Sequence, residues 1–214
     1  MYLEVKAKVH KENAEGTVLW VLVPHVSLTD RLAKYSNNRI LQGELRIDDS
    51  RTITGEQRRK YWATIRDISR WNGDDKDDNH EELKDMYCAA MGIDDFSMSN
   101  CSVSLARDYI TFILNFCIRW GVQLSEPILD RTDDIDAMLY FALKHRRCII
   151  CGEEGEHHHW DAIGMGRDRK TYDDSDHRKI CLCRDHHSEA HQMGRDSFGK
   201  KYHVYGIIYK ERGG

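Results

Sequence analysis

The sequence predicts an α+β fold, with N-terminal β-strands plus helices followed by a part that is rich in cysteine and histidine. Three observations lead to this prediction. Residues 5–47 contain short runs with strand-like alternation, and residues 54–120 repeat their apolar side chains at helical spacing. Residues 148–191 hold paired cysteines and several histidines. We place a domain boundary near residue 130, which gives domains of residues 1–130 and 131–214.

Length and composition describe a globular chain without membrane spans. The 214 residues are 40% hydrophobic and 32% charged, and no apolar run is long enough to cross a bilayer. The N-terminus lacks the basic and apolar regions of a secretory signal, so we expect a reducing cytoplasm, where seven cysteines need a use other than disulfides. A net charge of −4 argues against a broad nucleic-acid coat but permits a local basic groove.

The first fifty residues are predicted to form antiparallel strands. Val5, Ala7 and Val9 alternate with period two, and the β-branched run 18–23 stops before Pro24. A further short strand is predicted over residues 43–47.

Helices are predicted to follow. Thr54 with Gln57 has the spacing of a capping box, and Gly73 should end that helix. We interpret residues 74–78 as an acidic solvated loop and residues 81–91 as a short helix.

A longer helix is predicted from Ser102 to Trp120, where Gly121 should end it. Residues 124–127 look like a linker, and a new amphipathic helix begins at residue 132.

The paired cysteines predict a structural zinc site. Two half-sites of C-x-x-C and C-x-x-H spacing supply the four nitrogen and sulfur ligands of a tetrahedral Zn²⁺. These ligands are Cys148, Cys151, Cys183 and His186. Cys181 could formally replace Cys183, but only Cys183 has the right spacing to His186. A redox C-x-x-C is the alternative, and it would need a thioredoxin-like setting that the sequence does not offer.

Further histidines gather around the half-sites, and this enrichment indicates metal binding. The C-terminal part holds nine of the twelve histidines, including the run His157-His158-His159 between the half-sites. His187 and His191 follow with the i, i+4 spacing of one helical face.

This nested arrangement resembles the HNH nucleases of Gram-positive phages. The matching segments are residues 132–135, 148–151, 161–169 and 180–183. The resemblance covers residues 131–206 and continues upstream. It implies a C-terminal ββα-metal HNH module with structural zinc, and therefore a metal-dependent DNA endonuclease.

The resemblance also implies residue roles. His158 would be a metal ligand, His159 the general base that deprotonates water, and His187 and His191 ligands from the helix. A Mg²⁺ or Mn²⁺ ion would serve, and the imidazole-rich shell also suits Zn²⁺ or Ni²⁺. Strand alternation puts His158 on the side opposite to its two neighbours, so a register change of one residue would exchange ligand and base.

One position departs from the HNH pattern. The asparagine that gives the family its middle letter has no clear counterpart, because the segment 177–179 (His-Arg-Lys) stands about where it should be. A degenerate HNH fold that binds DNA without cutting it therefore stays open.

The N-terminal domain resembles the NinB/Orf recombination-mediator family of lambdoid phages. The resemblance rests on residues 53–62, 67–70, 101–104 and 121–125, and it covers residues 38–127. It implies a dimer that binds single- and double-stranded DNA and assists recombination proteins.

Two basic segments are candidates for DNA contact. Arg58, Arg59 and Lys60 lie at a helix start, and Arg167, Arg169 and Lys170 lie in a glycine-containing loop. An ordinary charged helix face and a solvated turn are the respective alternatives. We interpret residues 202–209 as a packing strand or a helix extension without chemistry.

Together these features predict a metal-dependent HNH DNA endonuclease that acts in phage recombination or replication in the host bacterial cytoplasm. Its partners would be duplex, single-stranded or branched DNA and single-strand-binding or recombination proteins, with a homodimer implied by the mediator resemblance. A catalytically silent zinc protein that binds DNA and recruits such factors is the rival interpretation. A structural virion component is the third.

Overall fold

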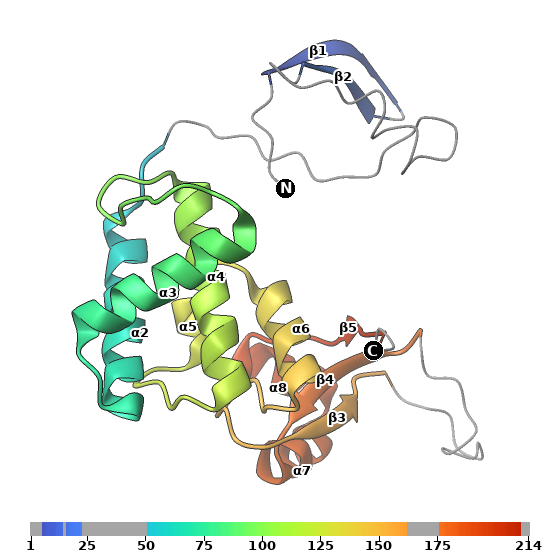
Figure 1. Cartoon of the computed structure of the whole chain (residues 1–214). Coiled ribbons are helices and arrows are strands. Elements are labelled where there is room, and N and C mark those ends of the chain that lie inside the picture. The colour runs from blue at the N-terminus through green and yellow to red at the C-terminus, as the bar shows by residue number, and fades with distance from the viewer. Residues whose placement is uncertain (1–5, 15, 23–50, 162–175, 211–214) are drawn as a thin grey trace. The chain divides into compact units, whose positions relative to one another are not determined.

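The computed structural model describes residues 6–14, 16–22, 51–161 and 176–210 (Figure 1). It contains helices and small antiparallel sheets, which confirms the predicted α+β class. The chain forms two compact units, Met1–Asp49 with Cys88–Asp94 and Ser50–Tyr87 with Asp95–Gly214. The strand predicted over residues 43–47 and the basic loop with Arg167, Arg169 and Lys170 lie outside the described residues.

The N-terminal unit contains a β-hairpin. Strands β1 (Lys6–Asn13) and β2 (Gly16–Leu22) pair antiparallel, as the alternation predicted. The rings of His10 and Trp20 stack at 4.3 Å across the two strands, although Trp20 keeps 63% of its surface exposed.

Helix α2 (Gly55–Asn72) begins and ends at the predicted caps. The side chain of Thr54 accepts a hydrogen bond from the Gln57 amide, and the Thr54 amide donates to Gln57 Oε1, which completes the capping box. Gly73 ends the helix in the left-handed region at φ 84°.

Helix α3 (Lys76–Met91) starts earlier than predicted. The acidic loop assigned to residues 74–78 is wrong from Lys76 onward, because these residues form the first turn of the helix. Asp77 and Asp78 lie in that turn, where the helix dipole and the free amides stabilise negative charge. These two acidic residues therefore belong to the start of a helix and not to a loop.

Helix α4 (Val103–Trp120) ends at the predicted Gly121, and Ser102, which was predicted to be its first residue, is its N-cap. It packs against α2, and the aromatic rings of the core meet there. Tyr61, Tyr87 and Tyr109 are buried. The ring centroid of Tyr109 lies 5.6 Å from that of Tyr61 and 5.1 Å from that of Tyr87. These ring contacts form part of the packed core between the helices.

A buried ion pair ties the segment after α4 to α2. Arg131 of α5 (Ile128–Arg131) places its guanidinium 3.2 Å from a carboxylate oxygen of Asp67, and both side chains are almost fully buried. Ser125 donates its hydroxyl to the same oxygen. Truncating either partner would leave the other with one remaining ionic contact, from Glu126 to Arg131 or from Arg70 to Asp67, and breaking such a buried pair costs up to about 3–5 kcal/mol.

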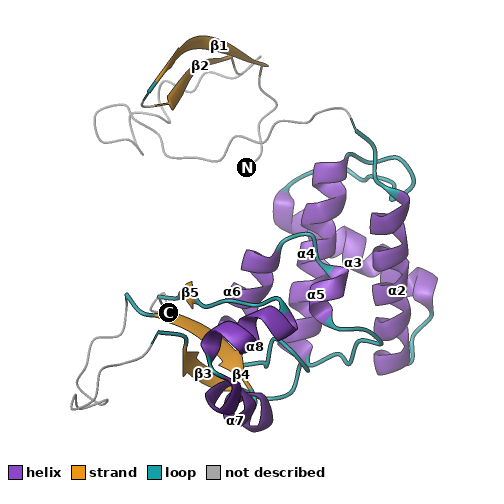
Figure 2. Cartoon of the chain, turned by 180° about the vertical axis from the view of Figure 1, so that it is seen from behind, coloured by secondary structure: helices purple, strands orange, loops and turns teal. Residues whose placement is uncertain are grey.

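Helix α6 (Ile135–His145) packs on α4 and on strand β4, so it joins the helical bundle to the C-terminal sheet (Figure 2). Residues on both sides of position 130 belong to one compact unit, and the two-domain division stays a prediction.

The C-terminal sheet has the order β3-β4-β5. Its antiparallel strands are β3 (Glu156–His159), β4 (Arg178–Leu182) and β5 (Ile207–Ile208). Helices α7 (Arg184–Met193) and α8 (Arg195–Tyr202) follow β4. Strand β5 confirms a packing strand within residues 202–209. Among the described residues, no helix has the length and apolar character needed to cross a membrane.

Candidate metal centres

Strands β3 and β4 and helix α7 position two groups of potential metal ligands. In the sheet, Glu156 pairs with Leu182 and His159 pairs with Lys179. Cys183 follows β4 directly and is the N-cap of α7, so the chain turns from strand to helix at a cysteine. Side chains from the strand, the turn and the helix are thereby brought close together.

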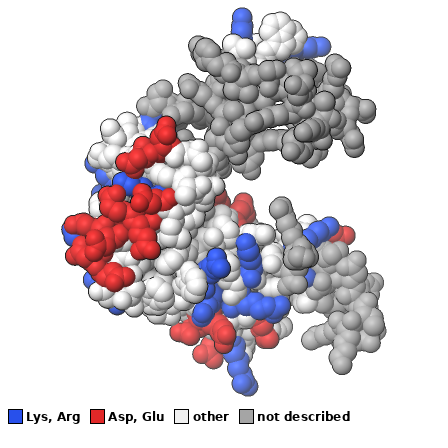
Figure 3. Space-filling model, in the orientation of Figure 1, with Lys and Arg blue, Asp and Glu red and all other residues white. Residues whose placement is uncertain are grey.

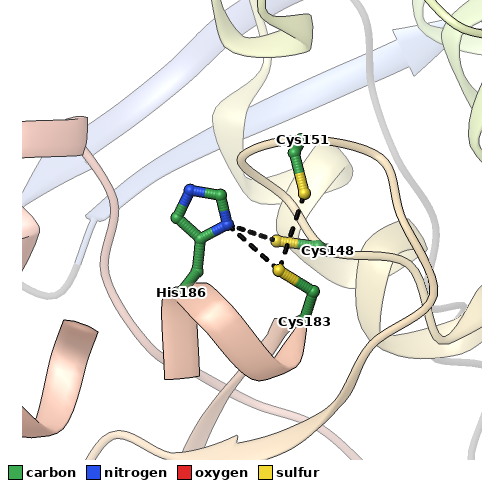
Figure 4. A group of neighbouring side chains, drawn as sticks. All are labelled: Cys148, Cys151, Cys183 and His186. Carbon is green, nitrogen blue, oxygen red and sulfur yellow. Dashed lines mark hydrogen bonds between the residues drawn. The ribbon is translucent and has the colours of Figure 1, made fainter. Parts of the chain in front are cut away.

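The first group holds four side chains (Figure 4). Two of them lie at the start of α7, and two lie in the tight turn of residues 148–152, which we call the knuckle. Cys148, Cys151, Cys183 and His186 place their ligand atoms within 4.8 Å of one another. His186 Nδ1 lies 3.5 Å from Cys148 Sγ and 3.2 Å from Cys183 Sγ, while Cys151 Sγ lies 3.7 Å from Cys183 Sγ. Tetrahedral Zn–S and Zn–N bonds imply separations of roughly 3.5–3.8 Å, so this group fits Zn²⁺.

The backbone of the knuckle explains the glycine behind its second cysteine. The Gly152 amide donates to the Cys148 carbonyl at 2.8 Å, and Gly152 adopts φ 76°. A residue with a side chain would be strained in this conformation. The tight turn lets Cys148 and Cys151 point toward the same place.

The thiols are poorly placed to ionise without a cation. Burial raises the pKa of Cys148, and burial together with the neighbouring thiols raises the pKa of Cys151 to about 12. A divalent ion would displace these protons and compensate the thiolates. Cys181 is also buried, but it lies outside the four-residue group, so the structure selects Cys183.

The second group contains three histidines, His158 from β3 and His187 and His191 from α7. Their ligand atoms also lie within 4.8 Å of one another. The ring of His158 is 4.5 Å from that of His187 and 4.9 Å from that of His191, and the Nε2 atoms of the two helix histidines are 3.0 Å apart. Three imidazoles leave coordination positions for water or substrate.

The triple histidine divides as strand alternation predicts. His157 turns away from the three-histidine group and donates from Nε2 to the Leu143 carbonyl at 2.9 Å, with its ring against Tyr209. His158 alone of the three faces α7. His159 is half-buried and lies near enough to His158 to influence its charge. The register therefore places His158 in the three-histidine group and His159 next to it along β3.

Glu156 is a part of the centre that sequence reasoning missed. His187 Nδ1 donates to Glu156 Oε1 at 2.7 Å, which directs His187 Nε2 toward the group. Carboxylates commonly orient metal-bound histidines in this way. The period of two along β3 could have revealed it, because Glu156 and His158 fall on the same side of the strand.

The environment keeps His158 neutral. Burial, followed by the neighbouring His187 and His191, lowers its pKa to about 4. A neutral imidazole offers its lone pair to a metal, so His158 is available as a ligand at neutral pH.

The predicted DNA contacts that the structure describes lie on α2. Arg58 and Arg59 are exposed, whereas Lys60 Nζ lies 3.0 Å from Asp133 and 3.2 Å from Glu56. In Figure 3, acidic side chains gather over the side formed by α3, while Lys and Arg side chains lie among the C-terminal elements. On the face that Figure 3 shows, acidic side chains are therefore concentrated over α3, whereas basic and acidic side chains both occur among the C-terminal elements.

Comparison with known proteins gives one family. Residues 26–212 match the family described as “Putative HNHc nuclease”, which covers well over half of the chain and contains both groups of ligands. No curated protein and no solved structure matches the chain.

Proposed function

The chain belongs to the HNHc nuclease family, and we propose that it is a metal-dependent DNA endonuclease whose C-terminal part is a ββα-metal HNH module. The observation that carries this proposal is the three-histidine group, formed by one strand and one helix beside a separate four-ligand group. In this arrangement, residues 131–214 would be the nuclease domain and residues 1–130 the DNA-binding domain.

The two groups would hold ions of different roles. Cys148, Cys151, Cys183 and His186 complete a tetrahedron, which is the donor set of a structural zinc. The three imidazoles would hold Mg²⁺ or Mn²⁺, and their nitrogen donors also suit Zn²⁺ or Ni²⁺. Such an ion stabilises negative charge on the phosphate and the leaving oxygen during hydrolysis.

The chain's own residues would supply the proton transfer and the alignment. His159 would take a proton from the attacking water, because it lies next to His158 on β3 without belonging to the three-histidine group. His158, His187 and His191 would fix the position of the phosphate through the ion, and Glu156 would hold His187 in its orientation.

The remaining parts of the proposal concern delivery to DNA. Arg58 and Arg59 on α2, with Lys60 nearby, and Arg167, Arg169 and Lys170 in the loop would contact phosphates. The mediator resemblance supports a role in phage recombination or replication in the bacterial cytoplasm, as a homodimer working with single-strand-binding or recombination proteins. The acidic α3 side would keep DNA from binding there, because like charges repel.

Replacing the proposed base tests the activity. We expect the wild-type protein to cut plasmid, single-stranded or branched DNA with Mg²⁺ or Mn²⁺, and His159→Ala to lower the rate by about 100-fold or more. His203→Asn is the matched control, because His203 follows α8, belongs to neither group, and has the positive φ that asparagine tolerates.

Two outcomes would contradict the proposal. Equal cleavage by wild type and His159→Ala would reject His159 as the base. An absence of cleavage on every DNA form would favour the catalytically silent protein that binds DNA and recruits other factors.

A further inference from the structure

We propose that the outward face of α2 binds a single-stranded segment of the nucleic-acid substrate, with Trp62 stacking on an unpaired base between Arg59 and Arg66. We call this surface the α2 groove. It is a hollow of about 510 Å³, and its floor and rims are formed by Glu56, Arg58, Arg59, Lys60, Trp62, Ala63, Arg66, Glu126 and Asp130. The inference deepens the proposed function, on which it rests, by naming the form of DNA that is held.

The cations of the groove are the first reason. Arg58, Arg59 and Arg66 are exposed, and among the described residues no acidic group forms an ion pair with any of them. Lys60 differs, because Asp133 and Glu56 hold its ammonium; burial works against its charge, but these hydrogen bonds raise its pKa. Phosphates would therefore be contacted by the arginines.

The acidic side chains of the groove do not cancel these charges. Glu56 is engaged by Lys60 at 3.2 Å, and Glu126 lies 2.9 Å from the guanidinium of the buried Arg131. Asp130 is the remaining carboxylate in the lining, against three guanidinium groups. The groove therefore has a net positive charge that matches a phosphate chain.

Helical spacing arranges these groups as a row. Arg59 and Arg66 are seven residues apart, which is two turns, or about 10 Å along the helix axis. Trp62 lies between them on the same side of α2. A strand that follows the row would meet a cation, an indole ring and a second cation.

The aromatic ring of Trp62 is the reason to infer that the groove binds a single strand and not a duplex. Its ring packs near Tyr61 and His80, with centroids 5.0 and 5.2 Å away, and it also lines the groove. An indole ring adds no charge for phosphate binding, but its face can stack on a base that is not paired in a duplex. Such platforms accept any sequence, because every base has an aromatic face.

Removing the cations tests the groove. Affinity would be measured by fluorescence anisotropy with a labelled single-stranded oligonucleotide and with a duplex of the same sequence. The protein would be full-length with His159→Ala and without added divalent metal, so that the DNA stays intact whether or not His159 is the base. We expect Arg59→Ala with Arg66→Ala to weaken single-strand binding at least tenfold and to reduce the slope of log affinity against log salt by about 1.4. Lys76→Ala with Arg107→Ala is the control, because it removes two cations that do not line the groove.

Removing the ring tests the form of DNA. We expect Trp62→Leu to weaken single-strand binding about tenfold and duplex binding less than twofold, and Trp62→Phe to restore most of the loss. Equal loss on both forms, or no loss on either, would overturn the inference. Binding is measured without cleavage, so these results stand whether or not the wild-type protein proves to be a nuclease.

Discussion

The two groups of ligands lie side by side on the same strand–helix unit, yet they differ in chemistry and surroundings. The four-residue group contains three thiols, one of them on a buried residue, and one imidazole, which is the number of donors that a tetrahedral site needs. The three-residue group contains nitrogen ligands alone, and His191 is exposed. Adjacent histidines, His186 and His187, belong to different groups because successive residues of a helix point in different directions.

The difference indicates a division of labour. A complete tetrahedron leaves no position for a substrate, so an ion there can only hold the fold. Three imidazoles leave positions open toward solvent, where a phosphate and a water can enter. If this comparison is right, damage to the first group should affect stability, and damage to the second should affect metal affinity and activity.

The largest effect is expected at the four-residue group. Cys151→Ser should remove one equivalent of zinc and unfold the C-terminal sheet and α7, because structural zinc contributes about 10–16 kcal/mol in small zinc domains. Zinc content by mass spectrometry and thermal unfolding by circular dichroism would measure both.

Cys181→Ala is the matched control for this change. Cys181 is buried on β4 but lies outside the group, so its loss should lower stability by about 1 kcal/mol without releasing zinc. A Cys151→Ser protein that keeps its zinc and its fold would contradict the assignment.

A smaller effect is expected from changing Glu156, whose carboxylate accepts a hydrogen bond from His187. Glu156→Gln should weaken metal binding to the three-histidine group by about 10- to 100-fold, because the amide holds the imidazole less firmly than the carboxylate does. Titration with Mn²⁺ or Ni²⁺, followed by calorimetry, would measure the affinity while the zinc content stays constant.

Glu154→Gln gives the corresponding control, because Glu154 is exposed two residues earlier and lies outside both groups. Unchanged affinity in Glu156→Gln, or simultaneous loss of zinc, would show that the two groups are not separate in the proposed way.

Local sequence signals predicted the parts of the fold that local physics determines. The capping box at Thr54 and the stop at Gly73 hold because the capping side chains and the glycine lie next to the helix they bound. The predicted start of α3 was wrong because Asp77 and Asp78 were interpreted as part of a solvated loop, although acidic residues also suit the first turn of a helix.

The candidate centre shows a similar limit. The C-x-x-C and C-x-x-H spacing predicted the four residues that the structure brings together, because each half-site spans a single turn. Alternation along β3 puts Glu156 on the same side as His158, but it could not show that His187 would meet Glu156, because that contact depends on how α7 packs against β3. Nor could sequence spacing show that Asp133 would reach across to Lys60.

The smallest effect concerns pH and belongs to the three-histidine group alone. The pKa of His158 in the folded protein is about 4, below its usual value near 6.5, because burial and its histidine neighbours oppose the charge. Between these two pH values the unfolded chain binds more protons than the folded one, so the free energy of unfolding falls as pH falls. His158→Asn removes this contribution. The difference in stability between wild type and variant should therefore shrink by about 1 kcal/mol from pH 7 to pH 5, a value reduced because the half-buried ring is partly screened by solvent.

Urea unfolding at several pH values, without added divalent metal, measures this difference. A pH-independent difference would mean that His158 binds protons equally well in the folded and unfolded states, and would contradict the conclusion that its surroundings in the three-histidine group keep it neutral down to pH 5.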